Sequence, residues 1–440
     1  MTTIIRYSLV ALVVVILSLL AWWYVFLSSK EDSLQTSDLG RGAGITPPSF
    51  GEAIGSTYNN ISENVSSFIE RVGSQNSEKT PPRLRQVTRT PVAGMDFVLR
   101  KANTQTIASN ALSTSTSALR FVERGTGYIF DSALDTQALV RITNTLVPQT
   151  YEALVAKNGG VILRNLEADT VVTSFASATS TMLKGDTAAP LSLSPLPKNI
   201  RGIAFSPSGE EILYTLEEQG GGTSLMRAGK KGEKARRVAT LGIVGWQLKW
   251  LPDNRIVLVQ NAEEGIAGYS YELKTNGMLE PLIGNISGLV LSLPIKAPGA
   301  AKAGALLYSS SALNLTLSAR ANAAASTATL PIRTTADKCA WNPVETLIAY
   351  CAVPQTSLGG NTGKWFRGEV HTTDTWWKID VGSGRAEILY APEGGLGLDV
   401  ESPTIDPEGT YIAFLNGADK SLWLLRLSGL PAKASAQVGE

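Results

Sequence analysis

The sequence predicts an all-β protein: a β-propeller of about seven blades, each with four antiparallel strands, preceded by an N-terminal transmembrane helix and a short stalk helix. One observation behind this prediction is a short phrase, strand, Pro-led turn and strand, that recurs from the middle of the chain to its end. Another is a long uncharged segment near the N-terminus. A period of about 40 to 45 residues made of short strands is typical of β-propellers.

Four copies of the phrase set the period. Their prolines, Pro207, Pro252, Pro343 and Pro407, are separated by 45, 91 and 64 residues. The second spacing is close to twice the first, and the third fits one period plus an insertion of about 20 residues. The copies read IAFSPSGEEILY (203–214), LKWLPDNRIVL (248–258), CAWNPVETLIAY (339–350) and PTIDPEGTYIAF (403–414).

The N-terminal segment 7–27 contains 21 residues without a charge. As a helix it would extend roughly 30 Å, the thickness of the hydrocarbon core of a bilayer. A cleavable signal peptide is the alternative, but residues 26–30 match a small-residue cleavage site poorly. Arg6 precedes the span and the charges after it nearly cancel, so we expect residues 1–6 in the cytoplasm and the bulk of this single-pass cell-membrane protein outside.

Residues 28–82 are predicted to form a linker or stalk, because this segment opens with the Ser, Asp and Gly residues typical of a tether. Within it, apolar residues at steps of four and three predict an amphipathic helix over about 50–72. We favour packing of this helix on the membrane surface or on the propeller. The alternative is weak self-association along the same stripe, for which three heptads are barely enough.

Weaker repeats supply the other blades. Short apolar or alternating runs predict three further units, at 118–142, 151–173 and 288–332, the last without its Pro turn. Together with the four phrases they give seven blades, with six and eight as the alternatives.

Closure of the ring requires a strand from elsewhere, because the last repeat ends after three strands, at 421–427. We predict that residues 84–90 complete the final blade and leave no open sheet edge. The propeller then spans 83–428, and residues 429–440 are expected to be a disordered tail.

The phrases Phe205-Ser-Pro-Ser-Gly, Trp341-Asn-Pro and Ile405-Asp-Pro-Glu-Gly, each followed by a strand of the Ile-Ala-Tyr or Ile-Ala-Phe type, resemble the WD40-like repeats of the TolB type. The resemblance covers about residues 83–428, although the Gly-His and Trp-Asp pairs of WD40 repeats are missing. It implies a scaffold that binds proteins or peptides on its faces. The motif is structural, so it carries over no catalytic residue.

The two cysteines, Cys339 and Cys351, flank one predicted hairpin and are equidistant from its centre at Glu345. Directly opposite residues of antiparallel strands have Cα atoms about 4.5 or 5.5 Å apart, within the reach of a disulfide. An extracytoplasmic location permits oxidation, so we favour a disulfide; two small buried thiols are the alternative.

Residues for familiar chemistries are scarce. A single histidine, His371, excludes metal sites built on several imidazoles, and we interpret it as a solvated loop residue. No Walker loop, Gly-x-Gly-x-x-Gly or Gly-x-Ser-x-Gly motif is present. A net charge of +1 provides no excess of positive charge for binding nucleic acid. We therefore expect no nucleic-acid partner, no cofactor and no metal.

The Gly-rich insertion between Gln355 and Thr373 is the best candidate for recognition, because extra residues on a repeat array form loops on one face. Its residues Trp365, Phe366 and Arg367 are of the types that anchor protein interfaces. The alternative is that both aromatic side chains fold back over the blade.

A rival function is a glycan-binding propeller or a glycoside hydrolase, which would place carboxylates around the central channel. The candidate acids are Asp96, Glu152, Asp253, Asp337 and Asp399. Nothing in their spacing separates them from ordinary turn residues. The sequence thus favours a membrane-anchored, extracytoplasmic and non-enzymatic scaffold that binds a protein or peptide partner of the cell envelope.

Overall fold

The computed structural model describes residues 82–100, 116–136, 138–178, 188–260, 263–294, 305–321, 324–358, 360–393 and 396–428. The segments predicted as cytoplasmic tail, transmembrane helix, stalk with its helix, and C-terminal tail lie outside these residues. Among the described residues, no helix is both long enough and apolar enough to cross a bilayer. The chain divides into two compact units, and all described residues belong to the second, Thr80–Glu440.

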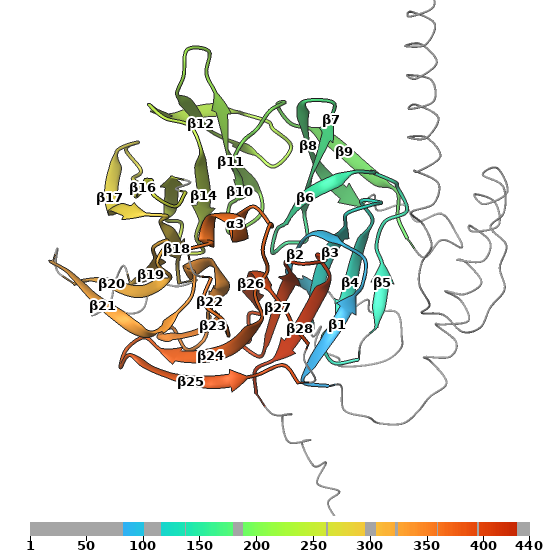
Figure 1. Ribbon diagram of the computed structural model, residues 1–440. Coiled ribbons are helices and arrows are strands. Elements are labelled where there is room, and N and C mark those ends of the chain that lie inside the picture. The colour runs from blue at the N-terminus through green and yellow to red at the C-terminus, as the bar shows by residue number, and fades with distance from the viewer. Residues whose placement is uncertain are drawn as a thin grey trace, which may run out of the picture. The chain divides into compact units, whose positions relative to one another are not determined.

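The described residues form seven antiparallel sheets of four strands, arranged as blades around one axis (Figure 1). The first strand of each blade is innermost and the fourth is outermost. Blade 1 consists of β2 (Val92–Arg100), β3 (Thr116–Glu123), β4 (Ile129–Ala133) and β5 (Leu139–Arg141). Blade 2 consists of β6 (Thr150–Val155), β7 (Val161–Glu167), β8 (Thr170–Ala178) and β9 (Leu191–Pro195). Blade 3 consists of β10 (Ile203–Phe205), β11 (Glu211–Glu217), β12 (Thr223–Gly229) and β13 (Arg236–Leu241).

The later blades follow the same order. Blade 4 contains β14 (Trp246–Trp250), β15 (Ile256–Gln260), β16 (Ala267–Leu273) and β17 (Leu279–Ser287). Blade 5 contains β18 (Val290–Ser292), β19 (Leu306–Ser309), β20 (Asn314–Ala321) and β21 (Ala324–Arg333). Blade 6 contains β22 (Cys339–Trp341), β23 (Ile348–Pro354), β24 (Asp374–Asp380) and β25 (Arg385–Tyr390). Blade 7 contains β26 (Val400–Ile405), β27 (Tyr411–Asn416), β28 (Leu422–Arg426) and β1 (Leu84–Thr88).

The ring closes as the sequence predicts. Strand β1 pairs antiparallel with β28, with Leu84 opposite Leu425 and Gln86 opposite Trp423. The backbone N–H of Arg426 also donates to the carbonyl oxygen of Arg83 at 2.8 Å. The closing strand ends at Thr88, two residues earlier than expected, because the chain then turns at 89–91 into the innermost strand of blade 1.

The core is divided into seven apolar clusters, one between each pair of neighbouring blades. The alternation of side chains along a strand supplies two clusters at once. On β23, Ala349 and Cys351 face blade 5, whereas Tyr350 and Ala352 face blade 7. The short Ile-Ala-Tyr runs of the repeat are therefore largely buried strands that pack against a blade on either side.

The two faces of the ring carry different loops. Because all innermost strands run in the same direction, one face holds the turns between first and second and between third and fourth strands. The other face holds the turns between second and third strands and the connections between blades. The short helix α3 (Thr362–Phe366) belongs to this second face, which we call the α3 face (Figure 1). Strand β1 begins at the opposite face, so the chain enters the propeller there, at residues 82–83.

Removal of the closing strand should destabilise the propeller. A chain that begins at residue 90 leaves the edge of β28 unpaired, and the lost backbone hydrogen bonds amount to about 3 kcal/mol. We expect the Tm to fall by several degrees relative to a chain that begins at residue 82, measured by differential scanning calorimetry.

A synthetic peptide of residues 82–90, added in excess, should restore part of this loss. Equal Tm values for the two chains would show that β1 contributes nothing to closure.

Candidate functional site

The insertion at 355–373, between β23 and β24, carries α3 close to the axis of the ring, in front of the inner strands in Figure 1. The Thr362 hydroxyl donates to the carbonyl oxygen of Ser311, in a turn of blade 5, at 2.9 Å. Trp365 packs with Leu313 of the same turn and with Leu358 of the insertion. The insertion therefore lies over neighbouring blades and is held there by both polar and apolar contacts.

The three residues that the sequence predicts for recognition differ in their exposure to solvent. The side chain of Trp365 is buried, with only 4% of the residue exposed, so it has folded back as the alternative interpretation expected. Phe366 is 46% exposed, and its ring lies 4.9 Å from that of Trp365. Arg367 is exposed and its Nε donates to Glu369 at 2.6 Å. Only Phe366 and Arg367 are thus presented to solvent.

A buried polar cluster lies beneath α3, and we call it the Lys338 cluster: Lys338, Trp365, Thr372, Asp374 and Asp399. The Lys338 ammonium donates to Thr372 at 2.8 Å, to Asp374 at 2.5 Å and to Asp399 at 2.7 Å. It also lies 4.5 Å from the centre of the Trp365 ring, and the Trp365 indole N–H donates to Asp399 at 2.8 Å. All three ammonium hydrogens have acceptors, which is what a buried charge requires.

The charges in this cluster are unequal. Burial raises the pKa of the Asp374 carboxyl, against the opposing effect of the Lys338 ammonium. Burial also acts to raise the pKa of Asp399, but the Lys338 charge and the hydrogen bonds from Lys338, Thr372 and Trp365 outweigh it and hold that pKa below its usual value. Both carboxylates pair with Lys338, and Asp399 also accepts hydrogen bonds from Thr372 and Trp365.

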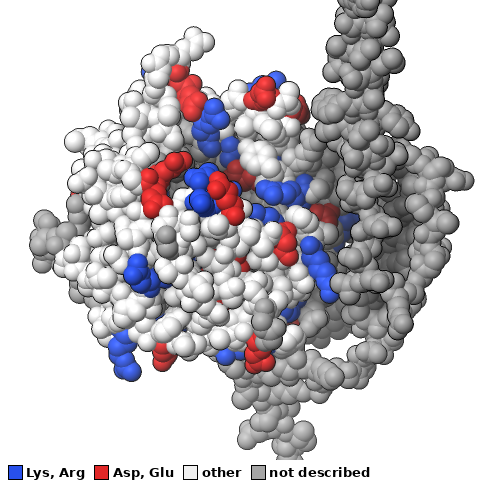
Figure 2. Space-filling model, viewed as in Figure 1, with Lys and Arg blue, Asp and Glu red and all other residues white. Residues whose placement is uncertain are grey.

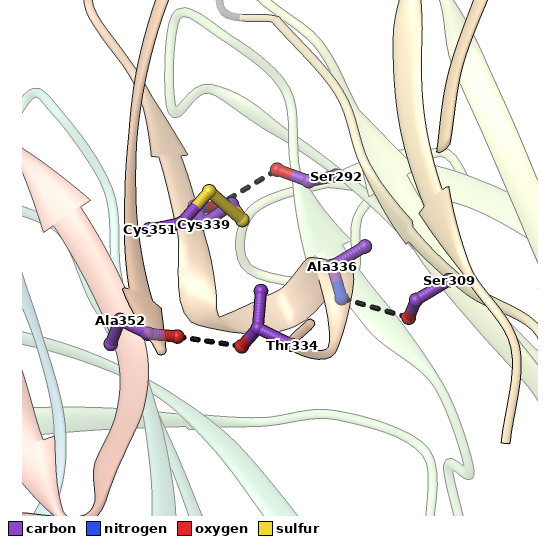
Figure 3. Close-up of a disulfide and its surroundings, with 7 residues drawn as sticks. All are labelled: Ser292, Ser309, Thr334, Ala336, Cys339, Cys351 and Ala352. Carbon is purple, nitrogen blue, oxygen red and sulfur yellow. Dashed lines mark hydrogen bonds between the residues drawn. A yellow bond between two sulfur atoms is a disulfide. The ribbon is translucent and has the colours of Figure 1, made fainter. Parts of the chain in front are cut away.

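Local structure around β22 fixes the position of Lys338. This residue ends the 3-10 turn η2 (Ala336–Lys338), whose first backbone N–H donates to Ser309 of blade 5 at 2.9 Å (Figure 3). The next residue, Cys339, lies directly opposite Cys351 and is joined to it by a disulfide. Ser292 donates to the carbonyl oxygen of Cys339 at 2.9 Å, and Thr334 donates to that of Ala352 at 2.6 Å (Figure 3). Lys338 is thus held between two blades.

His371 lies at the edge of the Lys338 cluster. Its Nδ1 is 3.1 Å from a carboxylate oxygen of Asp399, and its side chain is 40% exposed. Sequence reasoning identified His371 as a loop residue but missed its neighbours Lys338, Thr372 and Asp374. These residues share no sequence motif that would predict their proximity. Lys338 directly precedes the inner strand β22, whereas Thr372 and Asp374 lie at the end of the insertion and the start of β24.

The five acids considered for a glycan site do not form an exposed group. Asp96 contacts Lys157 at 2.6 Å, Glu152 pairs with Arg164, and Asp253 pairs with Arg255 at 2.7 Å in a turn of the opposite face. Burial raises the pKa of Asp337. Asp399 does lie near a second carboxylate and a tryptophan, but both acids are buried and share the Lys338 charge. Of these five acids, Asp96, Glu152, Asp253 and Asp399 are each paired with a basic residue.

Other parts of the described surface are weaker candidates for a functional site. A pocket on blade 3, at the opposite face, is lined largely by charged side chains, of which Arg227 and Glu211 pair with each other. No group of three or more His, Cys, Asp or Glu residues in the described part of the chain is arranged to hold a metal ion.

Comparisons with known proteins add the following. No family model and no curated protein matches the chain. Among solved structures, oligogalacturonate lyase from Vibrio parahaemolyticus matches 78% of this chain and 99% of its own, at 7% identity and a TM-score of 0.46. Virginiamycin B lyase from Staphylococcus aureus matches 76% and 100%, at 14% identity and a TM-score of 0.44. The Cps50 β-propeller domain from Myceliophteria thermophila matches 71% and 94%, at 10% identity and a TM-score of 0.44.

Loss of the Lys338 charge should destabilise the protein strongly. Lys338→Met leaves Asp399 as a buried carboxylate without its counter-ion, which costs about 3–5 kcal/mol. We expect this decrease in the free energy of unfolding in urea titrations. Lys364→Met, on the exposed side of α3, is the matched control and should change the free energy by less than about 0.5 kcal/mol. A similar effect of both substitutions would contradict the structural role of Lys338.

Reduction of the disulfide should have a smaller effect. Cys339 and Cys351 are 12 residues apart, and a loop of this length contributes about 2–3 kcal/mol by restricting the unfolded chain. We expect the free energy of unfolding to fall by this amount when the bond is reduced, with thiol labelling to verify reduction. The same reductant should leave the Cys339→Ala/Cys351→Ala double variant unchanged. An unchanged free energy for the reduced natural chain would rule out a stabilising role.

Proposed function

We propose that this chain is a membrane-anchored, extracytoplasmic β-propeller of the TolB type that binds a protein or peptide partner on its α3 face. Its role would be that of a non-enzymatic assembly scaffold of the cell envelope. The observation that carries the proposal is the exposed Phe366–Arg367 pair, on a short helix that is attached to the propeller through buried Trp365 and its hydrogen bond to Asp399. Aromatic residues and arginine are both enriched at protein interfaces, and arginine is among the residue types that most often dominate the binding energy.

Rigidity supports this function. Ordering a flexible loop on binding consumes part of the binding free energy, whereas α3 is already held by Trp365 and by the contacts of Thr362. Further exposed apolar residues occur in loops of the same face, at Ile243, Val244, Ile266 and Leu396. A partner that covers Phe366 therefore has additional apolar surface within the same face to bury.

The point of entry of the chain suits the predicted anchor. Residues 82–83 lie at the face opposite α3, so a membrane segment N-terminal to them connects to that opposite face. The α3 face is then the one away from the point of attachment. This polarity is what a tethered scaffold needs if it is to present its binding residues to a partner in the extracytoplasmic space.

Substitution of Phe366 should weaken partner binding without affecting folding. Phe366→Ser removes the exposed aromatic anchor, and we expect about a 10-fold or greater loss of affinity. The measurement is site-specific photo-crosslinking in intact membranes, followed by binding assays with the partner that it identifies. A point substitution is preferable to deletion of the insertion, because deletion would remove Trp365 and Thr372 from Asp399.

The matched control is Ile388→Ser, which removes an even more exposed apolar side chain from the outermost strand of blade 6. Recovery of the same partner by the Phe366 and Ile388 variants would eliminate α3 as the recognition element.

A further inference from the structure

Two neighbouring acids adjoin the insertion. Glu263 and Glu264 are exposed in the turn between β15 and β16 of blade 4, on the α3 face. Oε2 of Glu264 would lie 3.8 Å from a Cβ atom placed on Gly363, at the start of α3. Glu263 is close enough to Arg367 to add to the rise in the pKa of that guanidinium, whose main cause is the hydrogen bond to Glu369. The turn and α3 thus form one continuous surface.

This surface carries more acidic than basic side chains. Arg367 is engaged by Glu369 at 2.6 Å. Neither Glu263 nor Glu264 forms an ion pair with a lysine or arginine of the described residues, and Lys364 is the one further basic residue on α3. The surface therefore carries three acids against two bases. Figure 2 shows charged side chains gathered near the middle of this face, while the surface below them in the view is largely uncharged.

Apolar side chains lie among these charges. Ile266, two residues after Glu264, is 54% exposed, and Phe366 directly precedes Arg367. An exposed aromatic residue and an exposed branched residue, bordered by more acidic than basic groups, are complementary to an apolar side chain with positive charge on either side of it. The desolvated centre would supply affinity, while the charges at its edge would select the partner and accelerate association.

We infer that the α3 face binds a partner segment in which an apolar side chain is flanked by lysines or arginines. The apolar side chain contacts Phe366 and Ile266, and the basic side chains pair with Glu263 and Glu264. This inference rests on the proposed function and specifies the chemistry of the partner.

The test uses the full chain in nanodiscs of phosphatidylcholine, a zwitterionic lipid without net charge, and two synthetic probes. One probe is a nine-residue peptide with a central photo-leucine flanked by two lysines on each side, and the other has glutamates in place of the lysines. After irradiation, mass spectrometry maps the labelled residues. We expect the lysine probe to label the segments around Ile266 and Phe366 at least 10-fold more than the glutamate probe does. This preference should diminish as salt is added, because exposed charges are screened.

Charge reversal provides the decisive comparison. In Glu263→Lys/Glu264→Lys the preference should invert, so that the glutamate probe labels these segments and the lysine probe does not. The matched control is Glu167→Lys/Asp169→Lys, a pair of exposed acids beside exposed Leu166 in a turn of blade 2 on the same face, which should leave labelling unchanged.

Equal labelling by both probes, or loss of labelling in the blade 2 variant, would overturn the inference. The proposed function fails separately, if Phe366→Ser retains the partner. Loss of the partner in Phe366→Ser together with no effect of charge reversal would leave the proposed function standing and refute only the basic character of the partner.

Discussion

The pairing of β1 with β28 is the constraint on which the rest of the structure depends. A propeller blade can bury both of its surfaces only if it has a neighbour on each side, and a ring satisfies this condition only when it is closed. Here the closing contact joins residues more than 300 positions apart, as the hydrogen bond from the Arg83 side chain to the carbonyl oxygen of Arg426 illustrates. Once the ring is closed, the direction of every inner strand is set, and with it the face to which each loop belongs.

The Lys338 cluster uses this geometry to attach the insertion. It draws Lys338 from the start of β22, Asp374 from the start of β24 and Asp399 from the connection into blade 7. Removing such charges from water costs free energy that offsets much of their mutual attraction, so the presence of the cluster is weak evidence for a net gain in stability. Its complete set of acceptors determines where α3 lies.

The short helix has two different surfaces as a result. Consecutive residues of a helix point about 100° apart, so Trp365 can enter the cluster while Phe366 and Arg367 face solvent. The buried tryptophan acts as a positioning residue for the exposed pair. In the proposed role, side chains held in this way would lose little conformational entropy on binding.

The sequence by itself determined the blades. Strand and turn patterns are local, so the four Pro-led phrases, a closing segment predicted at 84–90 and the opposition of Cys339 and Cys351 follow from alternation and spacing. Only the tertiary structure decided which side of α3 is buried, because Trp365 and Phe366 are both large aromatic residues in the same loop. It also decided that Lys338 meets Asp399, 61 residues away, since that contact depends on how two blades and an insertion pack. Strand pairing follows regular spacings along the sequence, so it can be predicted. The contacts among the side chains of the Lys338 cluster follow no regular spacing, so the sequence does not predict them.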